Sequence, residues 1–161
     1  MEKMRSELKN ISDRLKKHIQ DIDKYCTLYH QWEKGYSEEA KKFKSEDKNV
    51  RADLYEAEAL EYRKRVDFLL KSSKLLEKVL IKVNLVDDWV DVLIYMLPSA
   101  YVLYKLSQEL MVYMPILSYE IGKTDQYMRS LVLRAYDETK MDIDFNHAKR
   151  EADKIWREVM E

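Results

Sequence analysis

The sequence predicts an all-α protein in which a long antiparallel helical hairpin is followed by two short helices and a C-terminal amphipathic helix. Three observations predict this fold class. The chain has only two glycines and two prolines in 161 residues, no proline precedes Pro98, and apolar residues recur at three- and four-residue steps over long stretches. We expect one helical domain over residues 1–161, with a hairpin at 2–97, short helices at 99–134, a linker at 135–142 and a terminal helix at 143–160.

Composition narrows the class of protein. Charged residues make up 37 % of the chain, which is typical of helices with much solvated surface, and the formal net charge is −1. No global positive field draws such a chain to nucleic acid, so we expect no nucleic-acid partner. The single cysteine, Cys26, excludes an internal disulfide and fits a reducing, cytoplasmic setting. No apolar run reaches the roughly 18–20 residues of a membrane span.

The first helix is expected over residues 2–45. One apolar stripe follows the helical repeat, while lysine and glutamate fill the other faces. Gly35 costs about 1 kcal/mol inside a helix, which weakens the helix locally without ending it. The stripe consists of Met4, Leu8, Ile11, Leu15, Ile22, Tyr25, Tyr29, Trp32, Tyr36 and Phe43.

A polar break at residues 44–50 is expected to reverse the chain, with Ser45 or Asn49 capping the next helix. The second helix is expected over 50–97, where a seven-residue repeat predicts a coiled-coil-like seam. Leu97-Pro98 is expected to end or kink this helix. One line of the seam consists of Tyr55, Tyr62, Leu69, Leu76, Val83 and Val90.

The last third of the chain predicts three shorter helices. Two of them, near 99–113 and 115–134, each begin beside a proline, which the first turn of a helix tolerates well. The polar residues that follow predict a linker, and the terminal helix after it has one apolar stripe. That stripe consists of Ile143, Ala148, Ala152, Ile155, Trp156 and Val159.

The sequence offers little for catalysis or metal binding. The three histidines are far apart, and neither a helical Glu-x-x-His pair, a glycine-rich phosphate loop nor a nucleophile elbow occurs. We therefore expect a protein that is not an enzyme and that needs no cofactor and no metal. The residues that keep both a chemical and a structural interpretation are Cys26 (nucleophile or packing residue), Asp87, Asp88 and Asp91 (cation ligands or a solvated face), and Asp142, Asp144 and His147 (metal ligands or a solvated helix start).

Basic residues gather on the first helix. Because acidic residues are interleaved with them, they form either an ordinary solvated face or a membrane-facing surface for anionic lipid. In the second case each well-placed lysine or arginine adds about 1 kcal/mol to binding. The candidate basic face consists of Lys3, Arg5, Lys9, Arg14, Lys16, Lys17 and Lys24.

Four features of the later sequence occur in a particular order. They are an acidic, tyrosine-containing segment that ends in EYRK at residues 61–64, the block LEKVLIKV at 76–83, the Leu97-Pro98 junction and the Met114-Pro115 junction. In this order and spacing they resemble the ESCRT-III membrane-remodelling family, specifically its archaeal CdvB-type cell-division branch. The resemblance covers roughly residues 50–130 in sequence and the whole chain in architecture.

This resemblance implies a self-assembling filament subunit that remodels or constricts membranes during cell division, vesicle release or virus release. Hairpins of successive subunits would stack side by side. The terminal helix would lie across a neighbour's hairpin near its tip, or fold back on its own chain in a closed form. The implied contact residues are Ile155, Trp156 and Val159 on the terminal helix and Phe43, Val50 and Leu54 at the hairpin tip, with ordinary packing as the other interpretation of Trp156.

The resemblance also implies partners. They are further copies of the chain, sister ESCRT-III subunits, and an anionic membrane surface reached directly or through a partner, which places the protein in the cytoplasm at a division site or budding neck. A Vps4-type AAA+ ATPase is a partner of longer members, but its recruiting motif is not seen here. We therefore expect a short paralogue or a core-only version. The alternative function is a helical coiled-coil adaptor that binds a protein partner and has no membrane role.

Overall fold

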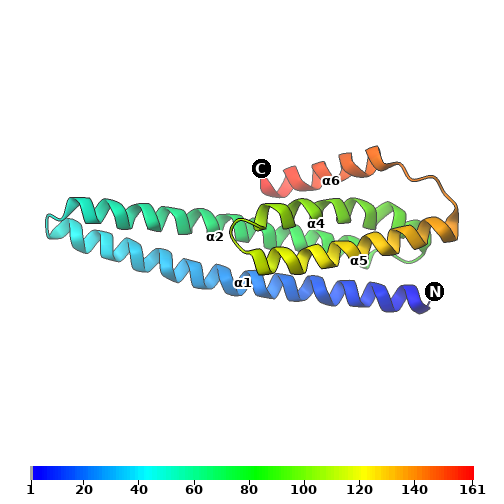
Figure 1. The fold of residues 1–161 in the computed structure, drawn as a ribbon, viewed down its shortest axis with the longest axis horizontal. Coiled ribbons are helices and arrows are strands. Elements are labelled where there is room, and N and C mark those ends of the chain that lie inside the picture. Colours follow the sequence, from blue (N-terminus) through cyan, green and yellow to red (C-terminus); the bar gives the residue numbers. More distant parts are fainter. Residues whose placement is uncertain (1) are drawn as a thin grey trace. The chain divides into compact units, whose positions relative to one another are not determined.

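Every regular element in the described part of the chain is a helix. The computed structural model describes residues 2–161. Its elements are α1 (Glu2–Ser45), α2 (Asn49–Asn84), α3 (Trp89–Asp91), the π-helical turn η1 (Val92–Met96), α4 (Leu97–Leu110), α5 (Pro115–Thr139) and α6 (Phe145–Met160). The predicted all-α fold is confirmed. The predicted hairpin is confirmed as well, because α1 and α2 are antiparallel helices joined by a short turn (Figure 1).

The chain divides into two compact units, which are described one at a time. The hairpin unit comprises residues 20–73, so it contains the second part of α1, the turn and the first part of α2. The bundle unit comprises residues 2–19 and 74–161, so it contains the start of α1, the end of α2 and all the later helices.

A Schellman-type turn reverses the chain in the hairpin unit. Asp47 has a left-handed φ of 59°. The Lys48 N–H donates to the Phe43 carbonyl at 2.9 Å, which satisfies a carbonyl at the end of α1. The prediction that Ser45 caps the second helix is wrong, since its hydroxyl donates to the Lys42 carbonyl at the end of α1. Lys48 is the N-cap residue of α2, and its carbonyl accepts from Ala52.

The second helix ends earlier than the predicted boundary at residue 97, because α2 stops at Asn84. Acidic side chains start the next helix four residues later. The Asp88 carboxylate accepts a hydrogen bond from the Asp91 N–H at 2.9 Å, and the Asp91 carboxylate accepts one from the Asp87 N–H at 3.0 Å. These bonds satisfy N–H groups that a helix start leaves without helical partners. The side chains of Asp88 and Asp91 therefore form a helix cap, to which Asp87 contributes its backbone N–H.

Pro98 does not end a helix. Residues 89–110 form one continuous helical run in which the π-turn Val92–Met96 lies directly before Leu97. In a π-turn, i→i−5 hydrogen bonds replace the i→i−4 hydrogen bonds of an α-helix. Pro98 has no N–H to donate, and it follows a segment in which the backbone hydrogen bonds are already rearranged. The Ser99 hydroxyl donates to the Tyr95 carbonyl at 2.8 Å and gives it a further partner.

The linker before the terminal helix is shorter and later than the predicted 135–142. Helix α5 continues to Thr139, whose hydroxyl donates to the Ala135 carbonyl at 2.8 Å. It stops at Lys140, which has a left-handed φ of 54°. Helix α6 begins at Phe145, since the Asp144 carboxylate accepts from the His147 N–H at 2.9 Å and so acts as the N-cap.

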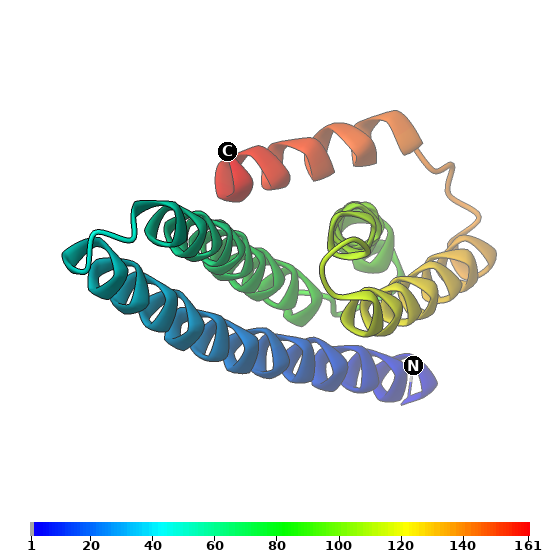
Figure 2. The same ribbon diagram turned by 60° about the vertical axis from the view of Figure 1, so that its left-hand side comes forward.

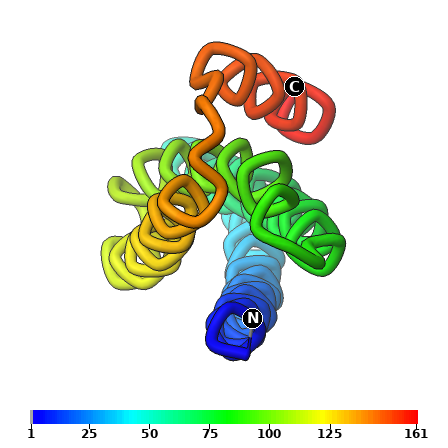
Figure 3. Tube along the Cα trace, turned by 90° about the vertical axis from the view of Figure 1, so that its right-hand side faces the viewer, coloured from blue at the N-terminus to red at the C-terminus, as the bar shows by residue number. Residues whose placement is uncertain are grey.

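The bundle unit has an apolar core between the stripe of α1 and helices α2, α4 and α5. Figure 3 shows the start of α1 and α6 on opposite sides of this unit. One polar pair is enclosed in the core, where His18 Nε2 lies 2.7 Å from Thr124 Oγ1 and both residues are buried. The fully buried side chains include Met4, Ile11, Leu15, Leu75, Leu76, Leu103, Leu106, Leu110 and Ile121.

Candidate functional site

The terminal helix α6 packs on its own chain. Its main partner in the bundle unit is α4 (Figure 2). Ile155 and Trp156 are each only 8 % exposed, and Val159 is half-buried. The predicted amphipathic terminal helix is confirmed, in the arrangement expected of a closed form. Its placement on a neighbour's hairpin stays a prediction.

Two polar contacts support this packing of α6. Lys78 on α2 forms an ion pair with the Glu158 carboxylate, and this ammonium group holds the pKa of Glu158 below its usual range. Lys105 on α4 places its Nζ 4.5 Å from the centroid of the Trp156 ring. Exposed ion pairs and cation–π contacts are each weak, so the buried apolar stripe provides most of the stabilisation of docked α6.

The predicted hairpin tip exposes apolar side chains on the first turns of α2. Val50 is 78 % exposed and Leu54 is 63 % exposed, and four-residue spacing puts them on the same helical face. Phe43 is only half-buried, and its ring lies 5.1 Å from that of Tyr55, measured between centroids. Arg51 lies 5.8 Å from the Phe43 ring. The tip therefore offers a small apolar surface edged by positive charge.

An aromatic ladder runs between α1 and α2 in the hairpin unit. Tyr36 and Tyr62 are nearly parallel, with 5.6 Å between ring centroids and 7° between planes, and Trp32 meets Tyr62 edge-on at 5.5 Å. Such pairs stabilise the contact beyond the area that they bury. The members of the ladder are Tyr25, Tyr29, Trp32, Tyr36, Phe43, Tyr55 and Tyr62.

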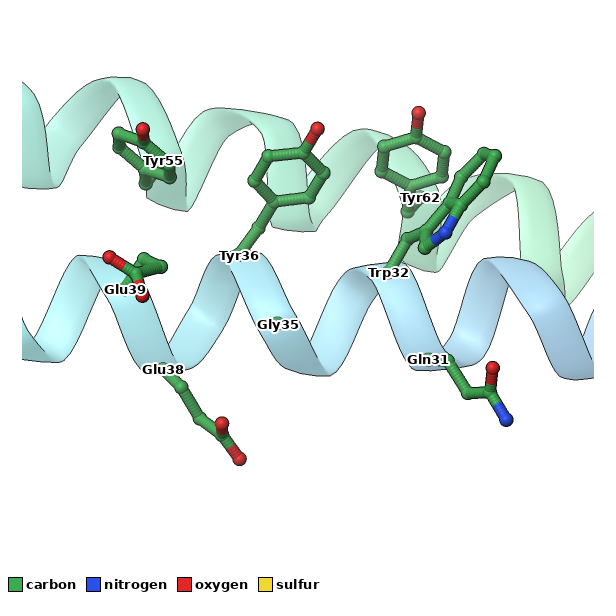
Figure 4. Close-up of a pocket in the computed structure, with 8 residues that line it drawn as sticks. All are labelled: Gln31, Trp32, Gly35, Tyr36, Glu38, Glu39, Tyr55 and Tyr62. Atoms are coloured by element: carbon green, nitrogen blue, oxygen red, sulfur yellow. The ribbon is translucent and has the colours of Figure 1, made fainter.

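A hollow of about 440 Å³ lies beside this ladder, over Gly35 (Figure 4). A Cβ added at Gly35 would meet no atom within 4 Å, so the glycine leaves open space between Trp32 and Tyr36. Figure 4 shows the Gln31 and Glu38 side chains pointing away from α2. The hollow is lined by aromatic rings and also by acidic side chains such as Glu39, which suits an apolar or cationic side chain of another protein.

The candidate basic face of α1 stays a prediction, and the structure gives the exposure of its residues. All of its residues except Arg14 are exposed, and Asp13 and Asp23 on α1 are exposed as well. Arg14 does not belong to this surface. Its Nε donates to Thr124 Oγ1 at 3.1 Å, and its guanidinium lies 4.9 Å from the centroid of the Tyr127 ring. Arg14 therefore ties α1 to α5 in the bundle unit.

The turn between α4 and α5 is an exposed apolar surface that the sequence analysis missed. Val112 is 82 % exposed and Ile116 is 80 % exposed. Turns are usually polar, so the apolar run MVYMPI at residues 111–116 indicates an exposed apolar surface. This signal was overlooked because the run was interpreted only as a junction between two helices. We name this surface the apolar turn, and its exposed residues are Met111, Val112, Tyr113, Ile116 and Tyr119.

Two titratable groups, Cys26 and Asp125, have structural partners. The Cys26 thiol donates to the Val66 carbonyl at 3.6 Å, and burial raises its pKa, which favours the unreactive thiol over the thiolate. Asp125 is buried on α5, and burial raises the pKa of its carboxyl although Arg129 Nε lies 3.0 Å away. Within residues 2–161, no three His, Cys, Asp or Glu side chains come together in a way that could hold a metal ion.

None of the helices in the described residues combines the length and apolar character needed to cross a bilayer. No family model matches the chain, and no solved structure matches it. Membership of the ESCRT-III family therefore stays a prediction from the sequence motifs, and the function inferred from it is a proposal.

Proposed function

We propose that the protein is a self-assembling helical subunit that forms filaments at a membrane surface and remodels or constricts that membrane. One observation carries the proposal: the expected contact residues at the hairpin tip and those on α6 differ in exposure. Val50 and Leu54 are exposed, whereas Ile155 and Trp156 are buried on their own chain. A closed polymer subunit would combine an exposed apolar pair with an amphipathic helix whose apolar face is covered by its own chain.

Assembly in this proposal needs α6 to leave α4. The segment at residues 140–144 has no helical structure, so α6 is joined to the bundle by a short connection. Release would free the stripe that contains Ile155 and Trp156, and a neighbour's Val50 and Leu54 would cover it. Because each new subunit buries apolar surface on the last one, assembly should increase with protein concentration.

Two surfaces of the bundle unit support a peripheral membrane role. The apolar turn combines aliphatic side chains with tyrosine, the composition that suits the boundary between lipid headgroups and acyl chains. Lys3, Arg5, Lys9, Lys16 and Lys17 on α1 add positive charge that anionic lipid attracts. The proposed role is mechanical and involves no chemical step.

Co-sedimentation with vesicles, followed by negative-stain imaging of the pellet, tests the proposal. We expect filaments on vesicles that contain anionic lipid, and weaker binding as salt screens the attraction. Particles that stay monomeric or dimeric on anionic vesicles at every concentration and salt level would rule out a membrane-bound polymer.

The second candidate function is a helical adaptor for a protein partner. The hollow over Gly35 favours it, because Trp32, Tyr36 and Tyr62 offer ring surfaces to an incoming side chain. An adaptor forms a discrete complex, so light scattering would give one constant mass as concentration rises. A mass that grows with concentration favours the polymer instead.

A further inference from the structure

A second hollow, of about 500 Å³, lies in the bundle unit where α4, α5 and α6 meet. Three cationic side chains line it, one from each helix: Lys105 on α4, Arg129 on α5 and Lys149 on α6. The only acidic side chain in its lining is Asp153. In a chain with a net charge of −1, such a local excess of positive charge is a specific feature of this place.

Aromatic rings, and not carboxylates, hold two of these cations. Lys105 Nζ lies 4.5 Å from the Trp156 ring centroid, and Lys149 Nζ lies 5.8 Å from that of Tyr101. Within residues 2–161, neither lysine forms an ion pair with a carboxylate. A ring face attracts a cation without cancelling its charge, so both ammonium groups keep their capacity to bind an anion.

Arg129 is held in place from two directions. Its Nε donates to the buried Asp125 carboxylate at 3.0 Å, and its guanidinium carbon lies 5.2 Å from the Tyr104 ring centroid. A guanidinium has five N–H donors, so the single bond from Nε leaves donors for a further acceptor. The arginine is therefore oriented before a ligand arrives.

We propose that this hollow, the α6 anion pocket, binds an anion with two or more phosphate groups, and that binding holds α6 against α4. Oxygen atoms on neighbouring phosphates match two separated ammonium groups and one guanidinium better than a single small anion does. Because Lys149 and Trp156 belong to α6, the complete pocket exists only when α6 is docked. A ligand that prefers the docked state must shift the population toward it. The pocket does not depend on whether the protein assembles.

Calorimetric titration with tripolyphosphate at constant ionic strength tests the site. We expect saturable binding to the wild type, and at least a tenfold loss of affinity in K105Q/K149Q. K105R/K149R keeps both positive charges and should retain binding. If it does, the loss in K105Q/K149Q comes from the missing charges and not from misfolding. The matched control K9Q/K16Q removes the same charge from α1 and should bind like the wild type. Equal affinities for the wild type, K105Q/K149Q and K9Q/K16Q would overturn the proposal.

Hydrogen exchange tests the coupling to α6. Tripolyphosphate should slow amide exchange in residues 145–160 of the wild type and leave exchange in K105Q/K149Q unchanged. Slowing that is spread evenly over the whole chain, or that is the same in both proteins, would contradict the coupling.

Vesicles distinguish the source of the phosphate groups. If a lipid headgroup is the ligand, vesicles with a bisphosphorylated phosphoinositide will lose binding in K105Q/K149Q. If the ligand is soluble, only tripolyphosphate binding will depend on these lysines, and K9Q/K16Q will be the variant that weakens vesicle binding. No dependence on Lys105 and Lys149 in either assay would refute the pocket while leaving the proposed membrane role open to its own test.

Discussion

Lys78 near the end of α2 and Glu158 near the end of α6 form an ion pair between side chains 80 residues apart in the chain. Because Lys78 lowers the pKa of Glu158, the pair stabilises docked α6 above the ordinary carboxyl pKa of 4.5, and this contribution is lost as the pH falls through the lowered value. The contribution of Asp125 to stability changes with pH in the opposite direction. Because burial raises the pKa of its carboxyl, protonation of Asp125 favours the folded state as the pH falls.

Acidification should therefore weaken the docking of α6. The measurement is the fluorescence of Trp156 in a W32F/W89F background, titrated from pH 7 to pH 3. We expect a change in emission below about pH 4.5, and a smaller one in E158Q, whose amide does not titrate. Identical titrations of the two proteins would show that this ion pair does not control docking.

Removing the buried ring of α6 should loosen that helix alone. A Trp→Ala change at a buried site costs about 3–5 kcal/mol, and here that loss falls on a terminal helix whose main partner is α4. In W156A, amides of residues 145–160 should exchange rapidly, while those of α4 and α5 change little. The matched control W32A, in the hairpin unit, should leave α6 exchange unaltered.

The turn of the hairpin should become more stable with glycine at position 47. Asp47 has a φ of 59°, a conformation that costs an L-residue up to about 1–2 kcal/mol and costs glycine almost nothing. We expect D47G to raise the free energy of unfolding in urea by about 0.5–1 kcal/mol. E56G on α2 should lower it by a similar amount, since glycine weakens a helix interior. A loss of stability in both variants would argue against the left-handed turn.

The all-α class, the hairpin turn and the terminal amphipathic helix could be predicted from the sequence, because long apolar stripes and a polar break report directly on helices and reversals. The end of α2 could not. The seven-residue pattern continues through Val83 to Val90, and the aspartates between them resemble a solvated face. Only their hydrogen bonds identify a cap, because the Asp91 N–H donates to the Asp88 carboxylate and the Asp87 N–H donates to the Asp91 carboxylate.

The surfaces were harder to predict than the helices. Val50 and Leu54 were predicted as contact residues at the tip, which no observation tests, and both are exposed. Arg14 could not be separated from its basic neighbours, since periodicity alone does not show that it reaches Thr124. The apolar turn was missed although its apolar run at residues 111–116 is contiguous, because the run was read as a helix junction. The proposed α6 anion pocket was missed because only the packing of α4, α5 and α6 brings its side chains together.

The apolar turn should contribute to membrane binding. V112D/I116D places charge on the two most exposed side chains of this turn, where insertion between headgroups would require desolvation of the new carboxylates. We expect reduced co-sedimentation with anionic vesicles and unchanged helical content by circular dichroism. L133D, at a 64 % exposed position on α5, is the matched control. Equal loss in V112D/I116D and L133D would indicate a general charge effect.

Negative-stain electron microscopy of the chain at rising concentration, compared with V50E/L54E, tests the proposed polymer most directly. Leu60 and Leu70 are exposed on the same helix, so L60E/L70E adds equal charge away from the tip and serves as the control. We expect filaments for the wild type and for L60E/L70E, and monomers for V50E/L54E. Filaments that form equally well in V50E/L54E, or a wild type that stays monomeric throughout, would contradict the proposed polymer.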